Sequence, residues 1–202
     1  MARQQLSAEA EHDMRCQLVD AGLALYRSAG LEAVSLRRLA DAVGISHTLP
    51  YRYFADKDAL LAAMRCACVR AFDQALCRSL TAAAAPETHL RRFAAAYVDY
   101  ACQHTADYLL IFTTEQPPPS QYPALLAARQ APFERAVVVV QAAIDAELID
   151  GEARTVAHQF WIMLHGLMTL HAANQLVHGR TVTELIDPLL TRILTAHRRE
   201  TP

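Results

Sequence analysis

Glycine, lysine and long apolar runs are scarce in this chain of 202 residues. Only six glycines stand among many alanines, and no useful length of sequence alternates as a β-strand would, so we predict an all-α fold. No apolar stretch approaches the roughly 18 to 20 residues that span a bilayer, and we expect no membrane partner. The polar N-terminus is unlike a secretion signal, which predicts a cytoplasmic protein.

The five cysteines are odd in number and match no zinc-binding spacing. Cys66 and Cys68 lie two residues apart on a predicted helix, where they face different directions. We therefore expect no metal site and no cofactor. Two interpretations of the thiols stay open: packed side chains in a reduced protein, or a redox switch that uses Cys66, Cys77 or Cys102.

An excess of positive charge is also missing, because the formal net charge is −2 at pH 7. Lys57 is the only lysine, and acidic residues balance basic ones over the first 60 positions. Any surface that binds nucleic acid must therefore be local. Enzyme signatures are absent too. The nine histidines form no His-Glu-x-x-His pair, and there is no Gly-x-Ser-x-Gly elbow or glycine-rich phosphate loop, so we do not expect an enzyme.

Apolar residues at spacings of three and four, bounded by capping residues and glycines, predict a series of helices. After a flexible arm at 1–10, the N-terminal helices are short or capped and cover 11–29, 36–43 and 47–53. The later helices are long and cover 57–82, 87–104, 106–115, 124–148, 152–178 and 182–198. This change in character predicts two domains, 11–56 and 57–202. Pro132 is expected to break or kink its helix, and Pro188 to start or bend the last one.

Two short helices joined by a glycine turn predict a helix-turn-helix motif. Ser35 caps the first of them, Gly44 supplies the positive φ that the turn requires, Ser46 caps the second, and Asp56 caps the helix that follows. Ala40 is small and lets the second helix pack closely across the first. Hairpins of this kind also occur as purely structural elements, so the spacing alone leaves both interpretations open.

The segment from Tyr51 to Lys57 places three aromatic side chains and two cations within seven residues. Phe54 can fill the core between the helices while the tyrosine hydroxyls point outward. Lys57 falls in the first turn of the next helix, where it can meet a phosphate alongside free backbone N–H groups. This arrangement favours a surface that reads DNA.

The stretch from Leu31 to Leu61 resembles the DNA-binding domain of the TetR family of bacterial regulators. The matching positions follow the family's order and spacing without a gap, and are Ser35, Ala40, Gly44, Ser46, Tyr51, Tyr53, Phe54, Lys57 and Leu60. Thr48 stands where the family has Gly or Pro, and Pro50 where it has Leu. Because Pro50 lacks an N–H, we expect the recognition helix to start irregularly or to tilt.

The resemblance implies a transcription regulator whose partner is a double-stranded DNA operator. Phosphate contacts are implied for five side chains, namely Ser35, Arg37, Tyr51, Tyr53 and Lys57. Base edges are the expected partners of His47, Thr48 and Arg52, which follow the capping residue Ser46. Arg38 is either a further contact or a solvated surface residue.

The resemblance also implies a C-terminal helical bundle that holds a small-molecule effector and a dimer interface. The segment around Trp161, His165 and Gly166 is similar to a C-terminal domain type named for those three residues. Trp161 and His165 are four residues apart and share a helix face. The predicted effector pocket is lined by Tyr97, Tyr100, Phe112, Trp161, His165, Met168 and His171. The alternative is that Trp161 is core and His165 makes one internal hydrogen bond.

Two leucine-rich stripes on the last two helices predict a homodimer with a four-helix interface. Their members are Leu164, Leu167, Leu170, Leu176, Leu185, Leu189 and Ile193. Two-fold symmetry predicts a near-palindromic operator, with its half-sites about 34–36 Å apart or more. The chain is thus expected to be a repressor that a small molecule releases from DNA. The alternative is the same fold with a cysteine-based redox signal.

Overall fold

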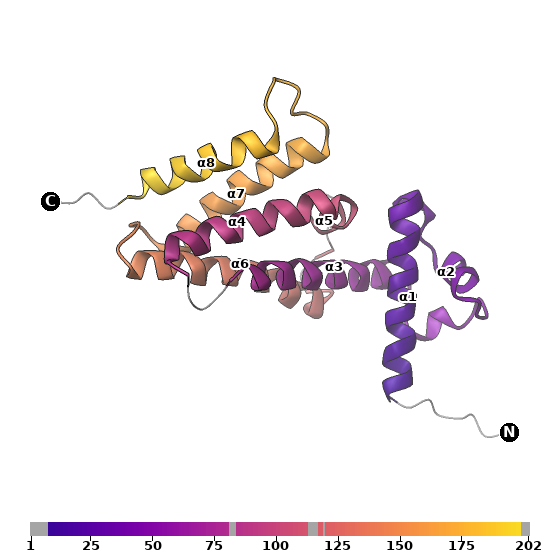
Figure 1. The fold of residues 1–202 in the computed structure, drawn as a ribbon. Helices are drawn as coiled ribbons and strands as arrows, with labels where there is room; N and C mark the ends of the chain where they lie inside the picture. The colour runs from indigo at the N-terminus through magenta and orange to yellow at the C-terminus, as the bar shows by residue number, and fades with distance from the viewer. Residues whose placement is uncertain (1–7, 81–83, 113–116, 119, 199–202) are drawn as a thin grey trace. The chain divides into compact units, whose positions relative to one another are not determined.

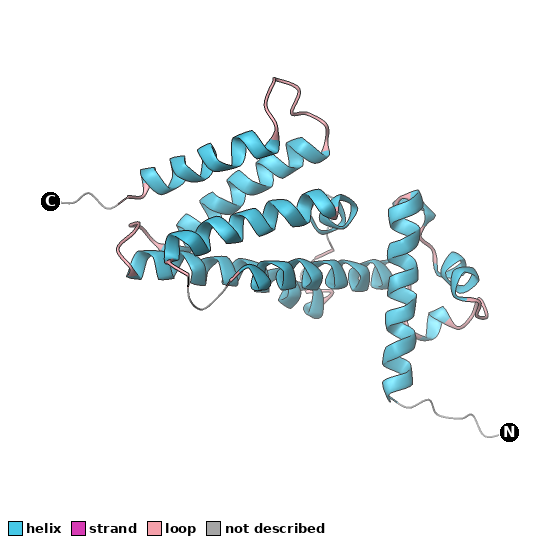
Figure 2. Cartoon of the chain, viewed as in Figure 1, coloured by secondary structure: helices cyan, strands magenta, loops and turns pink. Residues whose placement is uncertain are grey.

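The computed structural model describes residues 8–80, 84–112, 117–118 and 120–198, and its regular structure is helical (Figure 2). Within these ranges there are eight α-helices, two 3-10 helices and no strand. One isolated β-bridge joins Ile149 to Arg198. The predicted all-α fold is confirmed.

The helices fall into two compact units, and α3 contributes to both. Unit 1 comprises residues 1–68 and 114–126, and unit 2 comprises residues 69–113 and 127–202. In chain order (Figure 1) the elements are α1 (Ala8–Ala29), η1 (Leu31–Ala33), α2 (Leu36–Val43), η2 (Pro50–Arg52), α3 (Lys57–Ser79), α4 (Pro86–Gln103), α5 (Thr105–Phe112), α6 (Pro123–Asp145), α7 (Ala153–Ala172) and α8 (Val182–Ala196). The domain boundary predicted at residue 57 coincides with the start of α3, and the division between the units falls later, within that helix.

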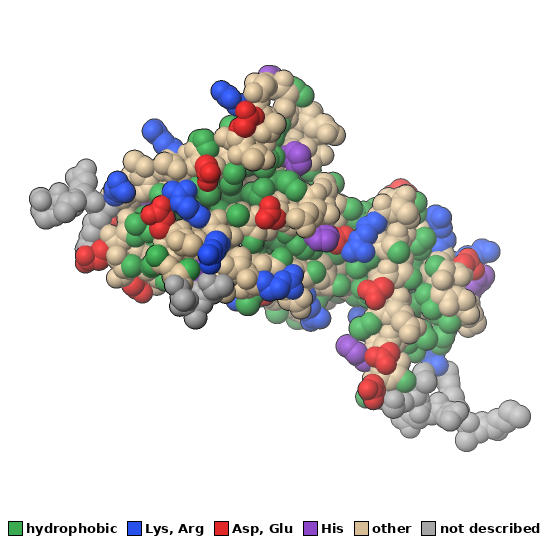
Figure 3. All heavy atoms as spheres, viewed as in Figure 1, with side chains coloured by type: hydrophobic (Ala, Val, Ile, Leu, Met, Phe, Trp, Pro, Cys, Tyr) green, Lys and Arg blue, Asp and Glu red, His purple; other side chains and the backbone are tan. Residues whose placement is uncertain are grey.

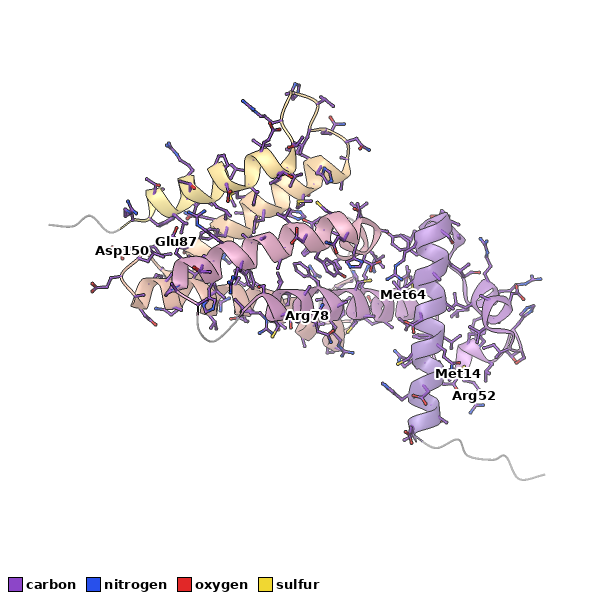
Figure 4. All side chains as sticks on the ribbon, in the orientation of Figure 1. Met14, Arg52, Met64, Arg78, Glu87 and Asp150 are labelled. Atoms are coloured by element: carbon purple, nitrogen blue, oxygen red, sulfur yellow. The ribbon has the colours of Figure 1, made fainter. Side chains whose placement is uncertain are left out.

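Unit 1 is built on the close approach of α1 to α2 and to the first half of α3. The apolar side chains between them are almost fully buried, among them Leu18, Leu39, Phe54 and Leu60. A Cβ atom at Gly22 would lie 2.9 Å from the sulfur of Met64, which Figure 4 labels on α3. The absence of a side chain at Gly22 therefore lets α1 and α3 come this close.

Unit 2 is a helical bundle in which α7 packs on α4 and α8, and α4 packs on α5. Tyr108, Leu110 and Met168 are its most deeply buried side chains. A bidentate ion pair between Arg135 on α6 and Asp73 on α3, at 2.8 Å, ties two further helices together. Carboxylate and guanidinium groups in this geometry hold helices in a fixed register.

The two prolines expected to interrupt helices lie inside them instead. The helix α6 continues through Pro132, so the predicted break is wrong. The ring of Pro132 is buried, and its packing offsets the backbone hydrogen bond that its missing N–H costs. The helix α8 starts at Val182 and not at Pro188, because Thr181 and Glu184 form a reciprocal capping box there.

Several helix ends differ from their predicted positions. The helix α1 already begins at Ala8, so residues 8–10 are not part of an arm, and residues 1–7 lie outside the described ranges. The helix α7 ends at Ala172, short of the predicted residue 178, because Asn174 takes a positive φ of 54° and turns the chain. The ends predicted at residues 82 and 115 fall outside the described residues. None of the described helices is both long and apolar enough to cross a membrane.

Candidate nucleic-acid interface and effector cluster

The turn after α2 is fixed by hydrogen bonds at both ends of that helix. The hydroxyl of Ser35 accepts the Arg38 N–H at 3.2 Å, so the predicted cap is confirmed. Gly44 lies in the left-handed region at φ 75° and ψ 35°. The Ile45 N–H donates to the Ala40 carbonyl at 3.0 Å, and the Gly44 N–H donates to the Asp41 carbonyl at 3.3 Å and to the Ala40 carbonyl at 2.9 Å. This is the bonding of a Schellman motif, which sets the direction in which the chain leaves α2.

The predicted recognition helix at 47–53 is wrong in type. Residues 47–49 form a turn, and only Pro50–Arg52 are helical, as a 3-10 helix. Pro50 cannot donate to the Ser46 carbonyl, which instead accepts the Leu49 N–H at 3.0 Å. Ser46 is not the cap, since the Ser46 hydroxyl contacts the Thr48 hydroxyl at 3.3 Å and Leu49 occupies the N-cap position. The irregular start expected from Pro50 thus extends through the whole segment.

The end of this segment is held by a residue that the sequence did not single out. Arg15, on α1, donates from Nη1 to the Tyr53 carbonyl at 2.6 Å. The Arg15 guanidinium also lies over the ring of Phe54, 4.4 Å from its centroid. Phe54 is 1% exposed, which confirms its predicted place in the core. A cation on a half-exposed helix gives no sequence signal for such a contact, because the contact depends on how α1 packs.

Lys57 begins α3 and has a structural contact that the sequence did not predict. The Lys57 ammonium donates to the Leu31 carbonyl at 3.4 Å, which links α3 to η1. Asp56 caps α3 as predicted, because its carboxylate accepts the Ala59 N–H at 2.8 Å. A lysine has three N–H donors, so one bond to Leu31 leaves donors for a second partner.

Most of the predicted DNA-contact side chains are accessible on unit 1. Tyr51 is 59% exposed. The exposed members are Arg37, Ser46, His47, Thr48, Tyr51 and Arg52, while Ser35, Tyr53 and Lys57 are half-buried. Arg52 is labelled on η2 in Figure 4, and the face shown in Figure 3 mixes basic and acidic side chains on this unit.

One acidic side chain on this surface was missed by the sequence analysis. The Nε2 atom of His47 lies 2.6 Å from Oδ1 of Asp41, in the last turn of α2. The side chains are 52% and 61% exposed, respectively. The two residues are six positions apart across a turn, a separation that no helical periodicity marks.

A chain of polar groups runs through the aromatic core of unit 2. The Tyr97 and Tyr108 hydroxyls lie 3.0 Å apart, and the Tyr108 hydroxyl lies 2.7 Å from Nδ1 of His165. Phe112 flanks this chain, with ring centroids 4.9 Å from Tyr108 and 5.3 Å from His165. Burial raises the pKa of Tyr97, raises the pKa of Tyr108 to about 12, and lowers the pKa of His165. All three groups are therefore neutral near pH 7.

Trp161 lies at the more accessible end of the same cluster. Its side chain is 37% exposed, and its ring is 6.0 Å from His165 and 6.1 Å from Phe133. Trp161 is thus not simply core, and His165 has more than one polar neighbour, since Thr169 Oγ1 lies 3.5 Å from its Nε2. We use the name aromatic cluster for Phe72, Tyr97, Tyr108, Phe112, Trp161 and His165.

The other predicted pocket residues have different environments. Tyr100 packs against Phe72, with ring centroids 5.2 Å apart, and so borders the aromatic cluster. Met168 is buried, at 1% exposure, whereas His171 is exposed and contacts none of these rings. Tyr108 and Phe72 were missed as cluster members, because their roles depend on the packing of α3, α4 and α5.

The predicted dimer residues divide into two sets. Leu164 and Leu167 are buried in the core of unit 2, so they are not available to a partner subunit, contrary to the prediction. Leu170 is 48% exposed, and Leu185, Leu189 and Ile193 are half-buried. Leu164 and Leu167 face inward because α7 presents them to the bundle, while Ile162 and Leu170 lie on its outer face.

The cysteines are free in the described part of the chain. Cys66 and Cys68 are buried, and Cys66 lies 3.8 Å from the Ala124 carbonyl, as expected of a packed thiol. Burial raises the pKa of Cys102, which lowers its thiolate fraction and its reactivity. Among the described residues, no group of three or more His, Cys, Asp or Glu side chains could hold a metal ion.

A capped helix, a Schellman turn and a short polar segment held by Arg15 and Phe54 define unit 1 as a helix-turn-helix unit. Comparison with known families agrees. Residues 18–64 match the family described as bacterial regulatory proteins, tetR family, and residues 90–195 match the tetracyclin repressor-like C-terminal domain. The chain belongs to the TetR family of transcription regulators, which are DNA-binding proteins and not enzymes.

Known proteins resemble part of the chain or nearly its whole length. A stretch of 61 residues is 36% identical to the HTH-type transcriptional repressor KstR of Mycobacterium tuberculosis (strain ATCC 25618 / H37Rv), covering 30% of this chain and 28% of that repressor. A protein of unknown function from Rhodococcus sp. RHA1 has a TM-score of 0.83 at 25% identity, covering 98% of this chain and all of its own. The fatty acid degradation regulator FadR from Bacillus halodurans shares the fold, with a TM-score of 0.71, 14% identity and coverage of 97% and 100%.

Proposed function

We propose that the protein is a dimeric repressor that binds a near-palindromic DNA operator and is released by a small-molecule effector. The observation that carries this proposal is the mostly exposed segment from Ser46 to Arg52, held between the Gly44 turn and the buried Phe54. A rigid segment with outward donors suits the major groove. The repressor KstR, similar over 61 residues, supports repression as the direction of control. A chromosome-binding regulator of a bacterial family acts in the cytoplasm.

The DNA contacts follow from where the side chains lie. Tyr51, Tyr53 and Lys57, with Ser35 and Arg37 at the start of α2, are proposed to contact phosphates, and His47, Thr48 and Arg52 to reach base edges. We use the name reading segment for residues 46–52. Because this segment is a turn and a 3-10 helix, fewer of its consecutive residues face the groove than an α-helix would present. We therefore assign specificity to few side chains, with Arg52 as the candidate for a guanine.

A second copy of this chain is the proposed partner of the outer face of α7 and of α8. Four predicted interface residues are exposed or half-buried and so can contact a partner, namely Leu170, Leu185, Leu189 and Ile193. Ile162, 65% exposed, extends this face. Two-fold pairing of these helices from each copy gives a four-helix interface and a symmetric pair of reading segments.

The aromatic cluster is the proposed effector region. Its neutral hydroxyls and imidazole provide a few polar groups within aromatic surroundings, which is the usual character of a small-molecule site. An effector that binds better to one spacing of the two reading segments shifts the dimer toward that spacing and changes its operator affinity.

Binding to the promoter region of the protein's own gene, followed by fluorescence anisotropy at several salt concentrations, tests the proposal. We expect affinity to fall steeply with salt. Lys57→Ala should weaken binding to all sequences and reduce the salt slope by about one. Arg78→Ala removes one exposed positive charge at the opposite end of α3 and serves as the matched control, with unchanged binding. Equal, salt-insensitive binding by the wild type and both variants would contradict the proposal.

A further inference from the structure

The pair formed by Asp41 and His47 lies on the surface that we propose to read DNA. Asp41 belongs to the last turn of α2, and His47 follows the Gly44 turn. The bonds from Gly44 and Ile45 to the Ala40 carbonyl fix the path between the two residues. The distance of 2.6 Å between Nε2 and Oδ1 is therefore a consequence of the turn, and more than half of each side chain is exposed.

The carboxylate of Asp41 requires a hydrogen on Nε2 of His47. An ionised carboxylate has no hydrogen to donate, so Nε2 of His47 must be the donor. In a neutral imidazole the other nitrogen, Nδ1, is then an acceptor. Neither Nδ1 of His47 nor Oδ2 of Asp41 has a hydrogen-bond partner within the described residues. The pair thus offers acceptors where Arg52, five residues on, offers donors.

Base pairs differ in what they present to such acceptors in the major groove. Cytosine presents its N4 amine and adenine its N6 amine, both of which donate, while guanine and thymine present acceptor oxygens. A pair of acceptors is therefore attracted to cytosine and adenine and repelled by guanine and thymine.

We infer that Asp41 is a positioning residue for His47, and that the pair selects a cytosine or adenine at one position of each operator half-site. The inference rests on the proposed function, since it requires that unit 1 binds DNA in the major groove. It identifies Asp41 as a specificity determinant, although a carboxylate would by itself repel the phosphate backbone.

Selection of binding sites from a randomised double-stranded DNA pool tests this inference. The wild type should enrich sites with cytosine or adenine at one position per half-site. Asp41→Ala and His47→Ala should each reduce that preference at the same position by about 5-fold or more, as the loss of one good base contact predicts. The double variant should lose no more than either single variant, because both act through one contact.

Asp20→Asn is the matched control, since Asp20 is an exposed carboxylate on α1 that contacts no histidine. It removes the same charge and should leave every base preference intact.

The outcomes separate this inference from the proposed function. If the wild type enriches no sequence and shows no salt-sensitive affinity for duplex DNA, the proposed function is wrong. If it enriches a site, but Asp41→Ala enriches the same site with tighter binding throughout, the carboxylate only repels phosphates and the inference is overturned. Circular dichroism melts of each variant confirm that the fold is intact before the sites are compared.

Discussion

The reading segment of unit 1 and the aromatic cluster of unit 2 are built in opposite ways. The reading segment is 46–52, one short stretch of chain in which every side chain except Leu49 and Pro50 is exposed and whose shape comes from backbone hydrogen bonds. The aromatic cluster gathers Tyr97, Tyr108 and His165 from three helices and buries their polar atoms. Side chains of the reading segment can therefore be exchanged at small cost in stability. In the aromatic cluster, the same polar atoms form the proposed effector site and stabilise the fold.

The largest expected effect is that of Phe54→Ala, because Phe54 is a buried anchor directly after the mostly exposed reading segment. Removal of a fully buried phenyl ring costs about 3–5 kcal/mol, and the Arg15 guanidinium loses its aromatic partner. Urea denaturation followed by circular dichroism measures the change. Tyr51→Ala, at an exposed neighbour, should alter stability by less than about 0.5 kcal/mol while it weakens DNA binding. Comparable destabilisation by both variants would show that the segment is not anchored at Phe54.

Tyr108→Phe tests the same comparison by a change in unit 2. The substitution removes the hydroxyl that joins Tyr97 to His165 and leaves a buried hydroxyl and a half-buried imidazole without this partner, at a cost of about 1–3 kcal/mol. Tyr51→Phe removes an exposed hydroxyl from unit 1 and should cost almost nothing in stability. Thermal unfolding of the two variants in parallel measures the difference, and operator affinity should fall only for Tyr51→Phe. A stable Tyr108→Phe variant would mean that the buried hydrogen-bond chain contributes little.

The smallest expected effect is a pH dependence of stability that originates in His165. Burial lowers the pKa of His165 in the folded protein, so the unfolded chain binds the proton more readily. Stability from this group is fully present above the unfolded pKa of about 6.5 and declines as the pH falls through that value. Urea midpoints measured between pH 5.5 and 7.5 should show this decline in the wild type and a weaker one in His165→Asn. Identical slopes for the two proteins would assign the pH dependence to other groups.

The features that sequence patterns predicted are those decided within a few residues. Ser35, Gly44 and Asp56 were identified as cap and turn residues, because each acts on backbone groups at most a few positions away. The family pattern recognised at 31–61 lies within the residues 18–64 that match the tetR family. The type of the segment at 47–53 was mistaken, because a single missing N–H at Pro50 outweighs the helical preference of its neighbours.

Contacts between distant parts of the sequence could not be predicted in the same way. The bonds from Arg15 to Tyr53 and from Tyr108 to His165 join residues 38 and 57 positions apart. The inward direction of Leu164 and Leu167 likewise depends on which face of α7 meets α4. A leucine stripe has the same pattern whether it faces its own bundle or another subunit, so the sequence could not separate the two.

The position of Trp161 provides a built-in optical probe. It is the only tryptophan of the chain, its indole is partly hydrated, and its ring lies 6.0 Å from the imidazole of His165. Ultraviolet emission excited at the indole band therefore originates from unit 2 alone and responds to any molecule that displaces water from that ring. Compound libraries can be screened by the colour and intensity of this emission without a dye, a label or DNA in the cuvette.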